Sequence, residues 1–293
     1  MRDPDVIYAT LVVIVLALAP TLAGQAGTTY YVSTSGNDTN PGTIRAPWLT
    51  IQHAANTVKP GATVYVSGGI YHESVNFPTS GRALAPITFQ SYPGQTAVID
   101  GTGVSCCGSS ATQGLINIMG SVSYITIRGF EIRNYTTSKA ADTPAGVWIT
   151  GSGAGIQILN NLVHHITTKS EKNGNAFGIA VYGTSKTPVT HLIISGNEVY
   201  DNRTGNSETL TLDGNVTNFK VTNNLVHDND NIGIDAIGYE GVGPSATTRR
   251  CMEKSAGTRS ITSAESQIPV RAVNTTPTDA TVTGAPMSRS SGT

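Results

Sequence analysis

Four segments of the sequence align without gaps: ITIRGFEIRN (125–134), IQILNNLVHH (156–165), LIISGNEVYD (192–201) and FKVTNNLVHD (219–228). In each segment, apolar residues occupy the first and third positions and return at the eighth. Alternation with a period of two on both sides of a fixed interruption predicts two short strands that meet at a bend. The chain therefore contains a repeated strand–bend–strand unit.

The bend has its own composition. Its fifth position holds only glycine or asparagine, which tolerate a positive φ, so we expect a left-handed residue at this corner. Its sixth position is asparagine in three of the four segments, and asparagines in register can hydrogen-bond along a stack. The fifth-position residues are Gly129, Asn160, Gly196 and Asn223, and the expected structural ladder is Asn161, Asn197 and Asn224.

A second template alternates with the first: GVWITG (146–151), GIAVYG (178–183), TLTLDG (209–214) and GIDAIG (233–238). Its first apolar positions are separated by 32, 31 and 24 residues. Two strand templates recurring at such a period are typical of a solenoid. We therefore predict an all-β parallel β-helix over residues 27–246, with one short helix in LTIQHAANTV (49–58), and prefer it to a β-sandwich.

The composition restricts the class of partner. Only 13% of the 293 residues are charged and the net charge is −1. Nucleic-acid binding requires clustered Lys and Arg to neutralise phosphates, and no basic stripe is present. A surface rich in hydroxyl and amide groups suits a sugar polymer.

The N-terminus resembles an export signal. Arg2 precedes the apolar run LVVIVLALA (11–19), which is followed by Pro20 and small residues. This order predicts a signal peptide over residues 1–26, because the run is short for a membrane span, although an anchor is the competing interpretation. We expect a secreted monomer with no membrane attachment after cleavage.

Residues 30–75 carry a family resemblance. The stretch YYVSTSGNDTNPGTIRAPWLTIQHAANTVKPGATVYVSGGIYHESV contains a first strand, a G-x-D turn, a capping helix and a first coil. It resembles the opening of secreted right-handed parallel β-helix proteins, including family 9 polysaccharide lyases, and the likeness continues to about residue 245. The resemblance implies a right-handed parallel β-helix with an N-terminal cap over 27–75. It is less specific for the activity, because many carbohydrate-active proteins share this opening.

The second template places two acids on one face. Alternate residues of a strand face opposite sides, so the residues between the apolar positions point outward. Asp213 and Asp235 then lie on neighbouring coils of one exposed face, diagonal to each other, with coils about 4.8 Å apart and a two-residue offset of about 6.6 Å. We therefore expect their carboxylates to share one ion or one substrate group.

More oxygen donors lie in the turns that enter these strands. Asp228 and Asp230 precede the Asp235 strand, and Asn206 and Glu208 precede the Asp213 strand. Carboxylate and amide oxygens around one point suit Ca²⁺. The sequence thus predicts a calcium site, while ordinary turn capping is the alternative for Asp228 and Asp230.

The resemblance to family 9 lyases implies a catalytic role for the calcium ion. Those enzymes use an aspartate-rich calcium site and a basic residue to cleave uronic-acid polymers by β-elimination. Carried onto this chain, the resemblance implies Asp213, Asp228, Asp230 and Asp235 as metal ligands. The base is not fixed by any motif, and the candidates are Arg203 and Lys220.

Other chemistry-bearing residues have simpler interpretations. Trp148 and Tyr182 lie on the proposed face and are candidates to stack on sugar rings. Histidines at one repeat position are interpreted as stacked side chains on the edge of the solenoid. Cys106 and Cys107 are adjacent, which indicates incidental thiols or one local bridge.

The repeat pattern ends near residue 246. Residues 247–293 show no alternation and no Gly/Asn bend, which predicts an irregular, disordered tail. A more specific hypothesis is a frame shift in the gene. If the codons for residues 252–262 are read two bases later, the permitted amino acids include a further coil that resembles the repeat. Resequencing this end of the gene tests that hypothesis.

Three functions remain open from the sequence. The leading prediction is a secreted, calcium-dependent lyase acting on an acidic, pectate-like polysaccharide. A β-helix glycoside hydrolase would use paired carboxylates without a metal, although the G-H-G and R-I-K signatures of polygalacturonases are absent. A non-catalytic carbohydrate-binding or cell-surface solenoid is the third alternative.

Overall fold

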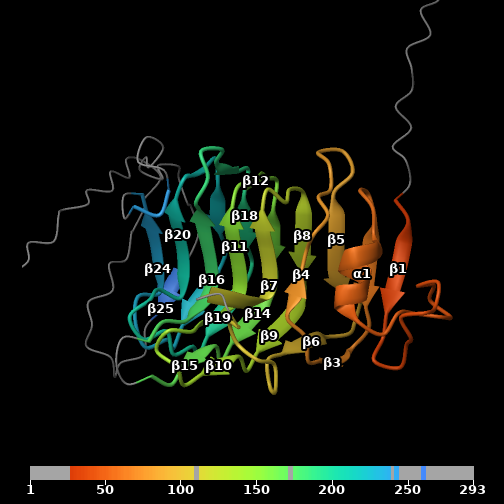
Figure 1. Cartoon of the computed structure of the whole chain (residues 1–293), viewed down its shortest axis with the longest axis horizontal. Coiled ribbons are helices and arrows are strands. Elements are labelled where there is room, and N and C mark those ends of the chain that lie inside the picture. Colours follow the sequence, from red (N-terminus) through yellow and green to blue (C-terminus); the bar gives the residue numbers. More distant parts are fainter. Residues whose placement is uncertain (1–26, 109–111, 171–173, 239–240, 244–258, 262–293) are drawn as a thin grey trace, which may run out of the picture.

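The structure, a computed structural model, describes residues 27–108, 112–170, 174–238, 241–243 and 259–261. The predicted signal peptide and nearly all of the predicted tail lie outside these residues. Short strands stack into an elongated parallel coil whose axis runs along the long dimension of the molecule (Figure 1). The predicted β-helix is confirmed.

Three parallel sheets form the sides of the coil, and each takes one strand from each successive turn of the chain. In the described residues, the first sheet comprises β1 (Thr29–Val32), β2 (Thr63–Val66), β5 (Ile87–Ser91), β8 (Ile125–Arg128), β13 (Gln157–Leu159), β18 (Ile193–Ser195) and β22 (Lys220–Thr222). The second sheet comprises β3 (Gly69–Tyr71), β6 (Ala97–Asp100), β9 (Phe130–Arg133), β14 (Leu162–His164), β19 (Glu198–Tyr200), β23 (Leu225–His227) and β25 (Arg259–Ile261).

The third sheet carries the second sequence template. It comprises β4 (Val75–Asn76), β7 (Thr112–Gly120), β11 (Thr143–Gly151), β16 (Phe177–Gly183), β20 (Leu210–Gly214) and β24 (Ile234–Ile237). Two small sheets line the remaining corners: β12 (Gly153–Ala154), β17 (Val189–Thr190) and β21 (Val216–Thr217) in one, and β10 (Thr136–Thr137) and β15 (Thr167–Thr168) in the other.

The register of the strands places like residues above one another. Ile158 of β13 pairs with Ile127 of β8 and with Ile194 of β18, and all three are buried. Each such side chain, withdrawn from water, contributes roughly 1.5–3 kcal/mol through the hydrophobic effect. The core is therefore a set of aliphatic columns that run along the coil axis.

The corner between the first and second sheets has the predicted geometry. Gly129, Asn160, Gly196 and Asn223 have φ values of 72°, 52°, 69° and 56°. One residue later, the side-chain oxygen of Asn197 accepts hydrogen bonds from the backbone and side-chain nitrogens of Asn161, each at 3.0 Å. Asn224 accepts the same pair of bonds from Asn197, at 3.0 and 2.9 Å.

A second ladder was not predicted. Asn202 Oδ1 accepts from the backbone N–H of Ile166 at 2.9 Å, and Asn229 Oδ1 accepts from the backbone N–H of Asn202 at 3.0 Å. This ladder lies where the chain leaves the second sheet for the third. Two corners of the coil are thus fixed by buried amides.

The helix α1 (Ile51–Thr57) lies at the end of the stack beside β1 (Figure 1). Thr50 caps it by accepting a hydrogen bond from the backbone N–H of His53 at 3.1 Å. The first backbone N–H groups of the helix, those of Ile51 and Gln52, donate to the carboxylate of Glu73 at 3.0 and 2.9 Å. A negative charge at a helix N-terminus is stabilising, so the cap is tied to the coil that it covers.

Candidate functional site

A pocket of about 310 Å³ lies on the outer face of the third sheet. Its wall combines side chains of the strands with side chains of the loops that lead into them. The described lining residues are Thr112, Thr143, Trp148, Asn175, Phe177, Tyr182, Asn206, Ser207, Glu208 and Ile237. Of the residues predicted from the sequence, the structure brings Trp148, Tyr182, Asn206 and Glu208 to this one place.

Three aromatic rings pack together in the pocket wall. The ring centroids of Trp148 and Tyr182 are 4.9 Å apart, and those of Trp148 and Phe177 are 6.2 Å apart and stacked. Phe177 is buried, whereas Trp148 and Tyr182 are half-buried. Mutual packing fixes the ring orientations, so Trp148 and Tyr182 are not isolated exposed aromatics.

The loops beside these rings are held by hydrogen bonds. The backbone N–H of Asn206 donates to Gly174 O at 3.0 Å, and Ser207 Oγ donates to Asn175 Oδ1 at 2.8 Å. These bonds join the loop before β16 to the loop before β20. The polar wall of the pocket is therefore built across two coils.

The two key acids lie on neighbouring strands of the third sheet. Thr211 pairs with Asp235 and Asp213 pairs with Ile237, so the two carboxylates occupy diagonal positions as predicted. The prediction that Asp213 is exposed is wrong, because its side chain is only 2% exposed. The alternation of a strand predicts on which side of the sheet a side chain lies, but it does not predict which other residues cover that side chain. Asp235 is half-buried, and its carboxylate accepts from the backbone N–H of Ala236 at 2.8 Å.

Asp228 and Asp230 have other partners. Asp230 accepts hydrogen bonds from Thr204 N at 2.7 Å, Thr204 Oγ1 at 3.1 Å and Gly205 N at 3.4 Å. Asp228 adopts a left-handed corner conformation and its Oδ2 lies 2.7 Å from Nδ1 of His227 on the second sheet. These contacts favour the turn-capping interpretation over the metal-ligand interpretation for both residues.

The remaining donors fit calcium in their chemistry. Asp213, Asp235 and Glu208 all supply hard carboxylate oxygens from the third sheet or its entry loop. The hydroxyl of Thr211, fully buried beside both aspartates in the sheet, has no hydrogen-bond partner among the described residues. No three of the predicted acids have oxygen atoms within 4.8 Å of one another, so these ligands would have to draw together around an ion.

The two candidate bases lie on different sides of the coil. Lys220 begins β22 in the first sheet and is exposed there, whereas the pocket lies on the third sheet. Arg203 is exposed and its backbone bridges Thr167 at the corner that leads to the third sheet. Only Arg203 remains a candidate for the base on geometric grounds.

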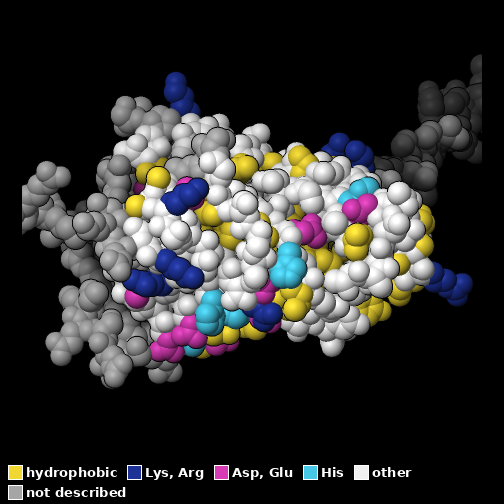
Figure 2. Space-filling model, turned by 60° about the horizontal axis from the view of Figure 1, so that its bottom comes forward, with side chains coloured by type: hydrophobic (Ala, Val, Ile, Leu, Met, Phe, Trp, Pro, Cys, Tyr) yellow, Lys and Arg dark blue, Asp and Glu magenta, His cyan; other side chains and the backbone are white. Residues whose placement is uncertain are grey.

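The histidines form a ladder on the second sheet. The Tyr200 ring stacks between His164 and His227, with centroid distances of 4.8 and 5.2 Å. Acidic partners flank this column: Glu131 lies 3.3 Å from Nε2 of His164, and Glu198 lies 3.1 Å from Nε2 of His227. Figure 2 shows His side chains close to Asp and Glu side chains toward the lower edge of that view.

The histidines differ in their titration. Burial, partly opposed by the hydrogen bond to Glu131, lowers the pKa of His164. For His227, burial acts in the same direction, but hydrogen bonds to Asp228 and Glu198 outweigh it and raise the pKa. These contacts are consistent with the predicted structural stack.

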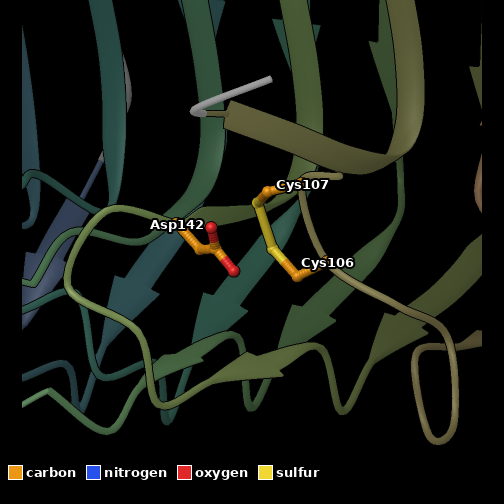
Figure 3. Close-up of side chains that lie close together, drawn as sticks. All are labelled: Cys106, Cys107 and Asp142. Atoms are coloured by element: carbon orange, nitrogen blue, oxygen red, sulfur yellow. A yellow bond between two sulfur atoms is a disulfide. The ribbon is translucent and has the colours of Figure 1, made fainter. Parts of the chain in front are cut away.

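The adjacent cysteines form a local bridge. Cys106 and Cys107 are joined by a disulfide, and the carboxylate of Asp142 lies beside them (Figure 3). The ligand atoms of these three residues lie within 4.8 Å of one another. In the described part of the chain, this is the one group of three or more His, Cys, Asp or Glu residues whose ligand atoms lie within that distance of one another.

The described residues contain no helix that is long and apolar enough to cross a membrane. The proposed signal peptide lies outside them and stays a prediction.

Comparison with known proteins identifies the family to which the chain is similar. Residues 30–224 match a family profile described as "Pel9A-like, right handed beta helix region". An uncharacterized protein of Bacillus subtilis (strain 168), YwoF, is 37% identical over 234 residues, which are 79% of this chain and 49% of that protein. The chain thus spans about half the length of this curated relative.

Two further matches are shorter or more distant. The pectate lyase PEL9 of Emericella nidulans is 41% identical over 73 residues, which are 24% of this chain and 18% of that protein. The solved structure of a rhamnogalacturonan lyase superposes with a TM-score of 0.51 at 17% identity, covering 73% of this chain and 62% of that one. At this identity the structural likeness supports the fold alone.

Proposed function

The chain belongs to the Pel9A-like right-handed β-helix family, and on that premise we propose that it is a secreted lyase that cleaves a uronic-acid-containing polysaccharide with the help of Ca²⁺. The pocket on the third sheet is the observation that carries this proposal. It combines an aromatic wall, amide and hydroxyl groups and the carboxylate of Glu208 on a solvent-facing side of the coil. Such a combination suits a sugar chain, which presents both C–H faces and hydroxyl edges.

The pocket residues have distinct roles in this proposal. Trp148 and Tyr182 contact the C–H face of a sugar ring, because the face of an aromatic ring is electron-rich. Asn206, from the loop before β20, hydrogen-bonds to sugar hydroxyls. The packing of Phe177 against both rings keeps the aromatic wall in place before substrate arrives.

The reaction is a β-elimination that removes the proton at C5 of a uronate. Calcium, held by Asp213, Asp235 and Glu208, would neutralise the negative charge that builds on the uronate carboxylate. Arg203 is the proposed base. A guanidinium serves as a base where nearby positive charge favours its neutral form, and the bound Ca²⁺ would supply that charge.

The test combines product and metal analysis. We expect the protein to release unsaturated products that absorb near the ultraviolet edge from a panel of uronate polymers, and a chelator to abolish this release. The double variant Asp213→Asn/Asp235→Asn should lose calcium binding measured by calorimetry, and Arg203→Ala should lose turnover while keeping calcium binding. Asp201→Asn, which changes an exposed acid in the bend directly after β19, is the matched control.

The pocket is tested separately by Trp148→Ala. We expect oligosaccharide binding to weaken about tenfold, which corresponds to roughly 1.4 kcal/mol. New reducing ends without ultraviolet absorbance would select the glycoside hydrolase instead. Sugar binding that depends on Trp148 but brings no turnover would select the non-catalytic carbohydrate-binding solenoid.

A further inference from the structure

The cluster of Cys106, Cys107 and Asp142 lies between two neighbouring coils. The cysteines belong to the loop before β7, and Asp142 directly precedes β11. These strands pair in parallel from their first residues, Thr112 with Thr143. Because the strands start side by side, the two loops meet and bring together residues that are 35 positions apart in the sequence.

The surroundings hold the three side chains in place. The backbone N–H of Cys107 donates to Gln113 Oε1 at 2.9 Å, and Cys107 is only 1% exposed. Asp142 is 15% exposed and lies 4.0 Å from Nζ of Lys139 and 3.4 Å from Oγ1 of Thr137. A half-buried carboxylate beside two sulfur atoms is therefore a fixed feature of this corner.

We propose that these three residues form a redox-gated site for a thiophilic divalent cation such as Zn²⁺. Zn²⁺ binds both thiolate sulfur and carboxylate oxygen, so these residues supply three ligands, and a water molecule completes the four ligands of a tetrahedral ion. The ligand atoms need only small shifts, because all of them already lie within 4.8 Å of one another. In the disulfide the sulfur atoms carry no charge, and the site is closed.

The gate is a thiol–disulfide exchange with a dithiol reductant. One thiolate of the reductant attacks Sγ of Cys106, which is more accessible than that of the buried Cys107, and Cys107 leaves as a thiolate. The second thiol of the reductant then displaces Cys106 and closes a new disulfide within the reductant. The protein gains two electrons and two protons, and metal binding releases those two protons from the thiols.

Binding at this site joins two coils. The disulfide links neighbouring residues of one loop, whereas the metal also engages Asp142 of the next coil. The residues that follow the two ligand loops, Thr112 and Thr143, both line the pocket of the third sheet. The bound metal therefore fixes one end of that pocket and connects successive turns of the solenoid.

Cobalt provides the test, since Co²⁺ replaces Zn²⁺ and reports thiolate ligands by a charge-transfer absorption. The full chain carrying Cys251→Ser, which removes the third cysteine, is titrated with Co²⁺ and then with competing Zn²⁺ after reduction by a dithiol and again after reoxidation. We expect one equivalent to bind to the reduced protein, at least 100-fold weaker binding to the oxidised protein, and a rise in the melting temperature of the reduced protein on adding Zn²⁺.

The variants separate the ligands from the fold. Asp142→Asn should weaken binding at least tenfold at an unchanged circular dichroism spectrum, whereas Asp201→Asn should bind as the parent does. Cys106→Ser/Cys107→Ser should remove the thiolate band. The proposal is overturned if the reduced parent does not bind, if Asp142→Asn binds equally well, or if oxidation leaves the affinity unchanged.

Discussion

At the scale of single residues, the surroundings of His227 in the second sheet make the stability of the protein depend on pH. Its two ring nitrogens face two carboxylates: Nδ1 lies 2.7 Å from Asp228 and Nε2 lies 3.1 Å from Glu198. The Tyr200 ring covers one face of the imidazole. Both carboxylates favour the charged imidazolium, which is why the pKa of His227 is raised despite partial burial.

The raised pKa of His227 predicts stability that is lost at alkaline pH. The contribution is fully present below the unfolded value of about 6.5 and disappears as the pH rises through the higher folded value. We expect His227→Gln to destabilise the protein by on the order of 1 kcal/mol at about pH 5.5, and by less at about pH 8.5. Urea unfolding at both pH values measures the difference.

His191→Gln is the control, because His191 is exposed and its ring hydrogen-bonds to the hydroxyl of Thr190 rather than to a carboxylate. Its effect should be the same at both pH values. A His227→Gln effect that grows with pH would contradict the proposed role of the two carboxylates.

Residue-scale prediction from the sequence was uneven for a physical reason. The outward side of Asp213 followed from strand alternation, whereas its burial did not, since burial depends on what packs over the sheet. The meeting of Cys106 with Asp142 had no sequence signal, because neither residue belongs to a repeated motif. Local patterns report local backbone geometry, and contacts between loops depend on the whole coil.

At the scale of elements, the corner between the first and second sheets depends on buried amides. Asn197 accepts two hydrogen bonds from Asn161, donates one to Ile158 O at 2.9 Å and pairs with Asn224. The side chain is 1% exposed. Removing the amide takes hydrogen-bond partners from buried groups, and each buried group that loses its partner costs free energy.

Asn197→Ala should therefore cost roughly 2–4 kcal/mol of unfolding free energy, more than a typical single substitution. Chemical denaturation measures this loss. Asn56→Ala, an exposed helical position, is the matched control and should change stability by less than about 0.5 kcal/mol. Equal effects of the two substitutions would show that the ladder adds no stability.

The sequence predicted this corner because its residues recur at a fixed place between two alternating strands. The second ladder was missed, although its signal was present: Asn229 follows Asn202 at the same spacing of 27 residues that separates Asn224 from Asn197. Those asparagines lie in loops without strand alternation. A search for constant spacing alone would have found them.

At the scale of the whole molecule, the fold is a sum of similar coils. Each strand pairs only with the strands of the preceding and following turns, as Ile193 pairs with Gln157 and with Lys220. Stability in such a solenoid is approximately a sum of coil terms and nearest-neighbour terms. One complete coil should therefore be removable.

Deletion of residues 193–219 tests this idea, because Lys220 follows Ile193 by one turn. The shortened protein should retain its circular dichroism spectrum and unfold cooperatively at lower urea concentration, with loss of the pocket side chains that the deleted coil supplies. Deletion of 193–206, about half a turn, should prevent folding because it shifts every later strand to another sheet. Similar behaviour of both deletions would contradict the coil-by-coil picture.

The position of α1 has a consequence for how this protein is made. The capped end of the stack is the end that leaves the ribosome first, since α1 and β1 precede all other coils. Each later coil can then pair with the strands of the coil that has already folded, while the rest of the polypeptide is still being synthesised. Growth in one direction spares the nascent protein a search for distant strand partners.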